Sequence, residues 1–470
     1  MTLANAIHQQ NGLRYITGLL QLHSSAGRQR MLSQKFFTDT TGLEKELNLL
    51  SGMVERLKDT EYQGAFISII QGLMQLHDIQ GTLNNLDGRN VLDDIELFEI
   101  KRFALIADEI GKQLKMLDYN DIKLPSLNDV VELLDPEGNR TAHFFIYAAY
   151  SEKLAQLRNK LKAAEDPQSD EAHVLHEKCI ELEDSIRQEL SAKLWALHSD
   201  ISLAWQGVAE LDFIMARARL AIDHHLVQPK ISEEVTTFKG LFHPQVKAVL
   251  EQENRTFQPW DISLYPAPCL ITGANMAGKT VLLKTLALNQ YLFQFGFYVA
   301  AASAEMVTVE KIMTGIGDEQ SELSGLSSFA AEMLNIQSII ASARAGNKLL
   351  VLIDEPARTT NPHEGIAIAN ALIDLLEKLN VRSLITTHYS GLQTHCRKLR
   401  VKGLSFPRNS EPITVANINR YMDYSLMEHS HDEVPREALQ IAQILDIDSE
   451  LIRRAKHYAD QNEKNIVEFL

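Results

Sequence analysis

The stretch that decides the fold is Cys269-Leu-Ile-Thr-Gly-Ala-Asn-Met-Ala-Gly-Lys-Thr280. It begins with a short apolar run, which predicts a buried strand, and a helical pattern follows from Lys279. Between the two, residues 273–280 match the pattern Gly-x4-Gly-Lys-Thr of a phosphate-binding loop. Glycines let the main chain turn its N–H groups toward phosphate oxygens at the start of a helix. The stretch therefore predicts an α/β domain with a nucleotide phosphate site.

The residues of this loop have distinct predicted roles. Lys279 is expected to place a positive charge at the β and γ phosphates, and the Thr280 hydroxyl to ligate Mg²⁺. We therefore expect ATP and Mg²⁺ as ligands. The predicted ATP-binding residues of the loop are Gly273, Ala274, Asn275, Met276, Ala277, Gly278, Lys279 and Thr280.

Two further strand ends carry residues that suit ATP hydrolysis. The apolar run 349–353 indicates a buried parallel strand, and it ends in Asp354 and Glu355. An aspartate in this position can hold Mg²⁺, and the adjacent glutamate can orient or deprotonate the attacking water. His388 follows another predicted strand, 382–387, and can sense the γ-phosphate; a structural histidine is the alternative. We predict an ATPase with Glu355 and His388 as catalytic residues and Thr280 and Asp354 as metal ligands.

The first half of the chain has a different composition and a different pattern of apolar residues. Residues 1 to about 230 contain few prolines, and apolar residues recur at helical spacing, as in Leu43, Leu47 and Leu50. A long helical run covers 171–222, and turns are expected at 134–139 and 164–171, the second joining two antiparallel helices. The sequence predicts an all-α domain over 1–232, a P-loop ATPase domain over 233–430 and a helical C-terminal segment over 431–470, with helices over 435–463.

Composition limits the range of functions. The 470 residues carry 46 Lys+Arg against 62 Asp+Glu, a formal net charge of −16. This excess of acid counts against a chain whose main task is coating nucleic acid, although a local basic face is compatible with it. For the best basic cluster, Arg28, Arg30 and Lys35, a solvated helix face is favoured over a DNA contact. No apolar run approaches the roughly 20 residues of a membrane span, so we expect no membrane partner and a cytoplasmic location.

Several segments resemble the MutS family of DNA mismatch-repair ATPases. The loop carries Asn275-Met276, a dipeptide that is typical of that family and not of phosphate-binding loops in general. Residues 354–365 look like its Walker B segment and the loop after it, and Thr387-His388-Tyr389 like its switch histidine. The resemblance implies an α/β ABC-type P-loop ATPase domain preceded by an all-α helical core/lever domain. It also implies that Phe257 stacks on adenine, with ordinary core packing as the alternative.

Residues 316–321 and 324–333 resemble the Q-loop and the signature segment of the family. The first is most similar to the MutS branch that often carries a C-terminal Smr nuclease domain. In MutS-type ATPases the signature helix reaches across a dimer to the partner's γ-phosphate, so the resemblance implies that Ser324, Gly325 and Ser327 contact ATP on the other subunit. A plain helix cap is the alternative. The resemblance further implies a homodimer or a heterodimer with a paralogue, a dimerisation role for 431–470, and DNA as a possible partner.

The chain also departs from the family's pattern. The core-like segment begins about 25 residues in, so we expect no mismatch-reading domain, and the acidic turn 164–171 replaces the DNA-gripping clamp. An Smr tail is also not expected. Several residues of the predicted nucleotide site also differ from those usual in the family. These differences leave ATP binding intact but put the turnover rate in question. The residues concerned are Ala274 for proline and Ala277 for glycine in the loop, Trp260 for asparagine, and Pro356 and Ala357 for an aliphatic residue and glycine.

Two functions remain open at this point. The first is a MutS-related ATPase that dimerises through its ATP sites and drives a helical lever acting on DNA. The second keeps the ATPase but replaces DNA with a protein partner, as a conformational switch or chaperone-like remodeller. It is motivated by the expected lack of the mismatch-reading domain and the clamp, and by the net charge of −16. A non-hydrolysing module is disfavoured by Lys279 and Glu355, and long coiled-coil ATPases by the lack of long heptad runs.

Overall fold

The computed structural model describes residues 1–141, 143–164, 166, 168–273, 277–316, 328–389, 391–404, 418–429, 438–444 and 447–468. Contacts within the chain define two compact units. Unit 1 comprises residues 1–5, 19–35 and 48–223, and unit 2 comprises 6–18, 36–47 and 224–470. The predicted domain boundary at residue 232 stays a prediction. In the contact pattern, residues 6–18 and 36–47 pack with the C-terminal part of the chain, and that part begins at His224.

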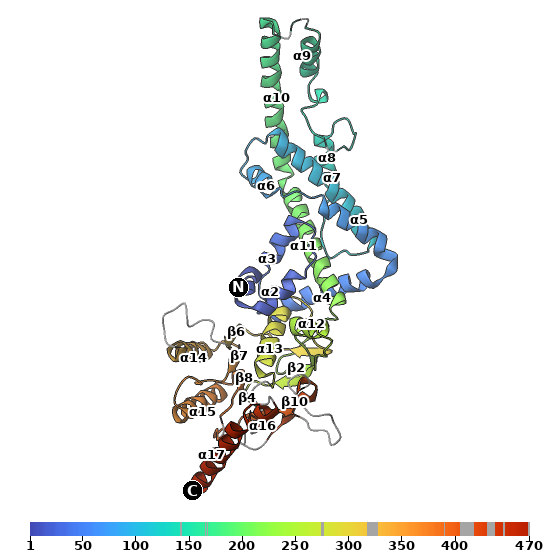
Figure 1. Cartoon of the computed structure of the whole chain (residues 1–470). Coiled ribbons are helices and arrows are strands. Elements are labelled where there is room, and N and C mark those ends of the chain that lie inside the picture. Colours follow the sequence, from blue (N-terminus) through green and yellow to red (C-terminus); the bar gives the residue numbers. More distant parts are fainter. Residues whose placement is uncertain are drawn as a thin grey trace. The chain divides into compact units, whose positions relative to one another are not determined.

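The first half of the chain is helical, as predicted (Figure 1). The run expected over 171–222 is divided in two at Leu197, where the main chain leaves helical geometry. Among the described helices, none is long and apolar enough to cross a bilayer. In chain order the elements are α1 (Leu3–Gln9), α2 (Asn11–Gly18), α3 (Ser25–Ser33), α4 (Thr40–Lys58), η1 (Thr60–Tyr62), α5 (Gln63–Met74), α6 (Gln80–Asp87), α7 (Asp94–Met116), α8 (Asn128–Leu134), η2 (Ala148–Tyr150), α9 (Glu152–Lys162), α10 (Asp170–Ala196) and α11 (His198–Asp223).

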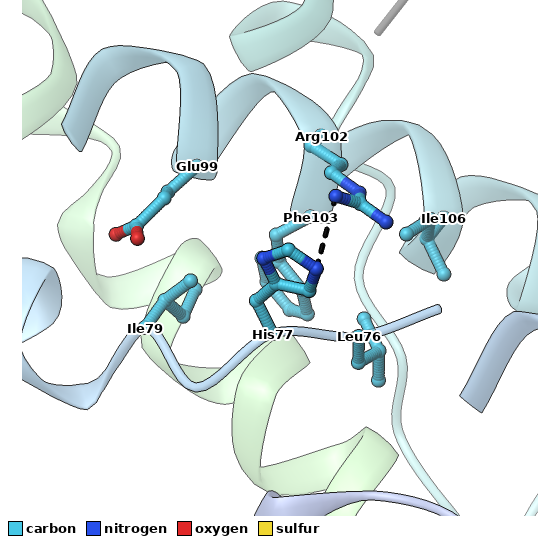
Figure 2. A pocket seen from close by; sticks show the side chains of 7 residues that line it. All are labelled: Leu76, His77, Ile79, Glu99, Arg102, Phe103 and Ile106. Atoms are coloured by element: carbon cyan, nitrogen blue, oxygen red, sulfur yellow. Dashed lines mark hydrogen bonds between the residues drawn. The ribbon is translucent and has the colours of Figure 1, made fainter. Parts of the chain in front are cut away.

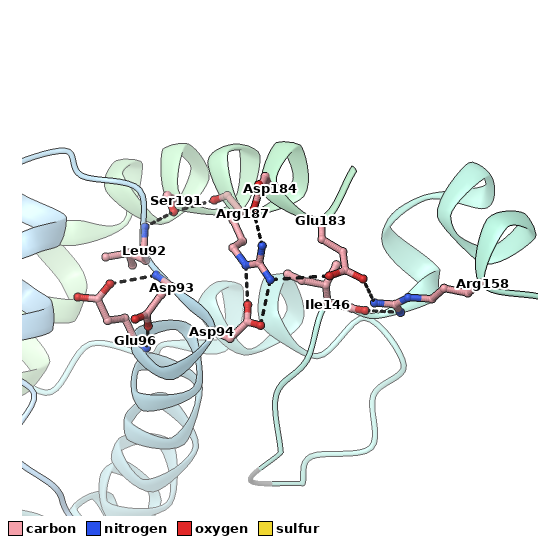
Figure 3. A network of polar contacts seen from close by, with 10 residues as sticks. All are labelled: Leu92, Asp93, Asp94, Glu96, Ile146, Arg158, Glu183, Asp184, Arg187 and Ser191. Carbon is pink, nitrogen blue, oxygen red and sulfur yellow. Dashed lines mark hydrogen bonds and ion pairs between the residues drawn. The ribbon is translucent and has the colours of Figure 1, made fainter. Parts of the chain in front are cut away.

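Charged side chains fasten three helices of unit 1 to one another (Figure 3). Arg187 of α10 donates from Nε and Nη2 to the two carboxylate oxygens of Asp94, at 2.7 and 3.1 Å, at the start of α7. Arg158 of α9 donates to Glu183 of α10 at 2.7 Å. Paired, charge-assisted bonds of this kind fix the orientation as well as the distance of their partners. The helices α9 and α10 therefore pack side by side as the predicted antiparallel pair. Arg187 holds α10 to the first residue of α7.

Unit 2 contains two sheets. The smaller has the order β1 (Lys230–Ile231), β5 (Ser303–Met306), β2 (Thr236–Leu241) and β3 (Trp260–Leu264). The larger has the order β10 (Met422–Glu428), β9 (Arg397–Leu404), β4 (Pro268–Thr272), β8 (Arg382–Thr386), β7 (Leu349–Asp354) and β6 (Lys311–Gly315). Its strands β9, β4, β8, β7 and β6 are parallel, and β10 is antiparallel to β9. The predicted parallel sheet with strands at 269–272, 349–353 and 382–387 is thus confirmed.

Helices cover both faces of the larger sheet (Figure 1). The remaining elements are α12 (Pro244–Gln252), α13 (Lys279–Gln294), α14 (Ser328–Arg344), α15 (Pro362–Lys378), η3 (Ile418–Tyr421), α16 (Ala438–Ile444) and α17 (Ser449–Glu468). Ile339 of α14 and Leu372 of α15 are buried with Val351 of β7 in one core. Alternation along β7 turns Leu350 and Leu352 to the other face, where α13 lies. Burial on both faces explains why these strands are apolar throughout.

Buried amides tie α13 to the chain around it. Gln294, at 0% exposure, donates from Nε2 to the carbonyls of Phe37 and Val309 at 2.6 and 2.7 Å. Gln290 donates to the carbonyl of Val307 at 2.9 Å. A buried amide is stable only when its hydrogen bonds are made, so these contacts hold the 36–47 segment on the helix that follows the phosphate loop.

The C-terminal helices agree with the prediction where the structure describes them. The first is α16 and the second is α17, whose start is capped by Asp448: its Oδ1 accepts a hydrogen bond from the Leu451 N–H at 2.8 Å. An aspartate at this position satisfies an N–H group that has no partner inside the helix. The residues 435–437, where the first helix was expected to begin, lie outside the described residues.

Candidate nucleotide site

The predicted phosphate loop connects β4 to α13, as the sequence pattern requires. Within it the structure describes Gly273 and residues 277–280; Ala274, Asn275 and Met276 lie outside the described residues, as do Ser324, Gly325 and Ser327 of the predicted signature. Gly278 stands at the helix start with φ of +75°, and a Cβ there would come within 3.2 Å of the Tyr424 ring. Both the left-handed main chain and the close ring favour glycine at this position.

Lys279 is the first residue of α13, and its side chain turns back toward the loop. Its Nζ donates to the carbonyl of Gly273 at 2.7 Å and lies 3.9 Å from Oε1 of Glu355. The residue is only 5% exposed. Burial lowers the pKa of the Lys279 amine, while the carboxylates of Glu355 and Asp354 oppose that shift. A buried ammonium group of this kind gains from an anion placed beside it, which is what a phosphate would supply.

Asp354, the last residue of β7, is held by two hydroxyl groups. The Thr280 Oγ1 donates to its Oδ2 at 2.6 Å, and the Thr386 Oγ1 donates to its Oδ1 at 2.5 Å. Hydroxyl and carboxylate oxygens are the hard ligands that Mg²⁺ prefers, and nucleotide phosphates usually complete its shell. The pair Thr280 and Asp354 therefore fits the predicted metal site.

Thr386 is a residue that the sequence analysis missed. It ends β8, the strand next to β7, and lies opposite Asp354 in the parallel register. Besides its bond to Asp354, its Oγ1 accepts the N–H of Glu355 at 3.1 Å. One threonine thus orients both acidic residues. To predict its role from the sequence, one would need to know the strand order, because that order places residues 354 and 386 side by side.

Glu355 and His388 are brought together at the ends of β7 and β8. The Nδ1 of His388 lies 3.4 Å from Oε2 of Glu355. The glutamate side chain is 17% exposed and the histidine 40%. The His388 hydrogen bond is the largest effect on the pKa of Glu355 and lowers it below its ordinary 4.5; burial opposes, and the charges of His388 and Lys279 reinforce the decrease. Glu355 is therefore ionised at neutral pH and able to accept a proton.

The main chain after Asp354 is strained at two residues. Glu355 and Ala357 have φ of +51° and +60°, a region that costs non-glycine residues about 1–3 kcal/mol each. Ala357 is fully buried, and both of its main-chain groups are held: Tyr389 Oη donates to its carbonyl at 2.7 Å, and a Glu332 carboxylate oxygen accepts its N–H. The alanine that replaces the family's usual glycine therefore occupies a conformation that suits glycine. Surrounding contacts keep it there.

Phe257 packs against Trp260, whose ring approaches Gly278 of the phosphate loop. Its ring packs edge to face on Trp260, with centroids 5.2 Å apart and an interplanar angle of 88°. Trp260 is buried in β3, where its Nε1 donates to the Tyr424 carbonyl at 3.1 Å, and its ring approaches Gly278. Phe257 remains half-buried. Its contact with adenine stays a prediction, and the Trp260 departure from the family is explained by core packing.

A separate small cavity lies within unit 1 (Figure 2). In it, Arg102 and His77 form a hydrogen bond of 3.1 Å between Nη1 and Nε2. The cavity leaves about 10 Å³, room for about one water molecule. It is too small for a nucleotide. The lining residues are Leu76, His77, Ile79, Glu99, Arg102, Phe103 and Ile106.

Comparison with known proteins points to one family. Residues 269–463 match the family model described as MutS domain V. A protein of Carboxydothermus hydrogenoformans named Endonuclease MutS2 is 32% identical over 290 residues, which cover 60% of this chain and 35% of that protein. A protein of Bradyrhizobium sp. named DNA mismatch repair protein MutS is 29% identical over 322 residues, covering 66% of this chain and 34% of that protein.

The matched stretches thus span about a third of the length of these two relatives. The domain V match begins at Cys269, the first residue of the quoted stretch, and includes the loop, both acidic residues and His388. The match also runs past α16 into α17. Residues 269–463 therefore carry a MutS domain V, and over this stretch the chain is similar to the proteins of the MutS family.

Proposed function

We propose that this protein is an ABC-type P-loop ATPase that binds ATP and Mg²⁺ at residues 273–280 and hydrolyses the γ-phosphate. The observation that carries the proposal is the convergence of Lys279, Asp354 and Glu355 at the ends of β4 and β7. In the proposal Lys279 binds phosphate, Asp354 holds Mg²⁺ and Glu355 accepts a proton from the attacking water. Lys279 is far in the sequence from the adjacent residues Asp354 and Glu355, which argues against a chance cluster of surface charges.

The proposed roles follow from the contacts. Lys279 neutralises charge on the β and γ phosphates. Thr280 and Asp354 hold Mg²⁺, which when bound supplies positive charge to the phosphate oxygens. Glu355 accepts a proton from water as the water oxygen attacks the γ-phosphorus. The bond between that phosphorus and the bridging oxygen breaks, and ADP and phosphate leave. His388 orients Glu355 and senses the γ-phosphate.

The wider assembly is proposed from the family. In this proposal Ser324, Gly325 and Ser327 contact the ATP of a second subunit, which is an identical chain or a paralogue. Residues 431–470 contribute to dimerisation, and Phe257 contacts adenine. Hydrolysis moves the helical residues 1–232 as a core and lever, and DNA is the object of that movement. The names of the relatives, which include a mismatch-repair protein and an endonuclease, support DNA as the partner.

Dimerisation through the ATP sites is tested by trapping it. Glu355→Gln removes the proton acceptor but keeps the side-chain size, so ATP should bind without being hydrolysed. Sizing chromatography of this variant with ATP and Mg²⁺ should show a dimer, and with ADP a smaller species. A variant that elutes as a monomer with ATP contradicts the proposed contact from the second subunit.

The DNA partner is tested by adding DNA to the hydrolysis assay. ATP turnover is measured with homoduplex, mismatched, branched and single-stranded DNA at a stated low salt concentration, because phosphate contacts weaken steeply with salt. We expect at least one of these to change the rate and to bind directly. No binding and no effect from any of them would remove DNA from the proposal while leaving the ATPase intact.

A second candidate function is an ATP-dependent remodeller of a protein partner. The observation in its favour is the turn between α9 and α10, where Asp166, Asp170 and Glu171 are exposed. Together with the net charge of −16, these carboxylates would repel a phosphate backbone. Stimulation of ATP turnover by a protein ligand, in the absence of any DNA effect, would favour this function.

A further inference from the structure

One contact links the helix α14 to the loop that carries Glu355. The Glu332 side chain, on the second turn of α14, accepts the main-chain N–H of Ala357. Ala357 is fully buried and has φ of +60°. Its carbonyl accepts a hydrogen bond of 2.7 Å from the Tyr389 hydroxyl. Both groups of this peptide position are therefore set by side chains from other elements.

The strain at Ala357 makes the Glu332 contact consequential. A non-glycine residue stays in a left-handed conformation only when its surroundings hold it there. Pro356 stands between Glu355 and Ala357, and its ring fixes the φ angle of Pro356 itself. A change in the Ala357 main chain is therefore passed to Glu355 with little freedom to absorb it.

The other end of the contact is a rigid element. Asn335, one turn further along α14, donates to the Thr314 carbonyl of β6 at 3.1 Å. Two side-chain bonds thus connect α14 to the site side of the sheet. The helix itself begins at Ser328, inside the segment 324–333 that resembles the signature, and because a helix is a regular hydrogen-bonded element, displacement of one end moves the next turn.

We infer that Glu332 is a positioning residue that couples α14 to the proton acceptor Glu355. Placement of α14 sets the Ala357 peptide through Glu332, and the Ala357 peptide sets the Glu355 side chain beside His388. Hydrolysis in one subunit then depends on where its own α14 stands. This inference rests on the proposed function, because it requires that Glu355 act in ATP hydrolysis.

The coupling predicts a different result from that of a residue with only a structural role. Loss of a structural contact lowers stability and ATP affinity together. Loss of a positioning contact leaves ATP binding alone and lowers the rate of the chemical step, because a small misplacement of a catalytic group costs roughly 10- to 100-fold. A side chain that restores the hydrogen bond without the charge should restore the rate.

The experiment compares Glu332→Leu with Glu332→Gln, whose amide oxygen can still accept the Ala357 N–H. Steady-state ATP hydrolysis should show a kcat lowered roughly 10- to 100-fold in the leucine variant with KM unchanged, and near wild-type values in the glutamine variant. Hydrogen exchange by mass spectrometry should show faster exchange in the peptide that contains Ala357 for the leucine variant alone. Thermal melting confirms that both variants are folded.

Three outcomes contradict the inference. One is equal loss of kcat in both variants, another is an unchanged kcat in Glu332→Leu, and the third is unchanged exchange at Ala357. The exchange measurement does not depend on turnover, so it tests the contact by itself. Failure of the proposed function looks different: wild type and Glu355→Gln would then show the same negligible hydrolysis before any Glu332 variant is compared.

Discussion

Two buried lysines, one in each unit, show how burial alone differs from a binding site. Lys101 of α7 is 0% exposed, and its Nζ donates to Asp135, to the His143 carbonyl and to the Tyr147 hydroxyl at 2.9–3.0 Å. Lys279 is 5% exposed, and the Glu355 carboxylate lies 3.9 Å away. The first lysine meets a carboxylate at hydrogen-bond distance. The second lies farther from the Glu355 carboxylate, at 3.9 Å, and its Nζ donates to the Gly273 carbonyl at 2.7 Å.

The pKa directions follow this difference. Burial is the largest single effect on the pKa of Asp135 and would raise it, but the hydrogen bonds from Lys101 and from the Arg140 main chain, together with the charges of Lys101 and Arg140, lower it overall. Burial lowers the pKa of Lys279 because Glu355 and Asp354 do not fully compensate the loss of water. The Lys101 pair therefore stabilises unit 1, whereas Lys279 is proposed to bind the phosphates of ATP. Matched substitutions separate these two roles.

The largest expected effect is on stability, at the unit 1 lysine. Lys101→Met leaves the Asp135 carboxylate buried and without its cation, which typically costs about 3–5 kcal/mol of unfolding free energy. Urea unfolding of the variant measures this. The double variant Lys101→Met with Asp135→Leu should recover most of the loss, since both charges are gone. A single variant as stable as wild type would mean that the pair does not hold unit 1 together.

Lys279→Met is the matched change in unit 2 and should behave in the opposite way. Its fold should be as stable as wild type, because a buried charge is removed, while ATP hydrolysis falls by roughly 10²–10³-fold through lost charge stabilisation. Isothermal titration with ATP and a hydrolysis assay measure the two effects. Strong destabilisation with intact turnover would reverse the distinction between the two lysines.

Sequence patterns predicted the elements of the site better than the contacts between them. The strands at 269–272 and 349–353 were predictable because burial on both faces makes them apolar throughout, and Gly278 and Lys279 because a phosphate loop constrains its residue types. Thr386 was missed because its role depends on β8 lying next to β7. The contact from Glu332 likewise depends on how α14 packs. The packing of residues 36–47 with unit 2 was missed because helical periodicity marks an apolar face without identifying its partner.

The third prediction concerns pH at the Glu355–His388 pair. The folded-state pKa of Glu355 is below the ordinary 4.5, so its ionised form adds stability above pH 4.5, and that contribution is lost as pH falls through the lower folded-state value. The acid limb of kcat/KM, which reports the free enzyme, should likewise lie below pH 4.5. His388→Gln removes the hydrogen bond that lowers the pKa most, so the limb should move up toward 4.5. Profiles of kcat/KM between pH 3 and 8 measure this, and coincident limbs would contradict it.

The smallest expected effect is at the strained alanine. Ala357→Gly removes the side chain that makes φ of +60° unfavourable, which is worth about 1–2 kcal/mol, while the freer unfolded chain offsets about 0.4–1 kcal/mol of that. The net stabilisation should be roughly 0.5–1 kcal/mol, measurable as a higher urea midpoint. A lower midpoint would show that packing of the alanine methyl outweighs the main-chain strain.

The most direct measurement is Mg²⁺-dependent ATP hydrolysis by the wild-type protein beside Glu355→Gln, with ATP binding measured on both. We predict steady hydrolysis by wild type that is lost on removal of Mg²⁺, and loss of hydrolysis in Glu355→Gln by roughly 10²–10⁴-fold with ATP binding retained. Equal rates in the two proteins, or no ATP binding by wild type, would contradict the assignment of residues 273–280 and Glu355 to one ATPase site.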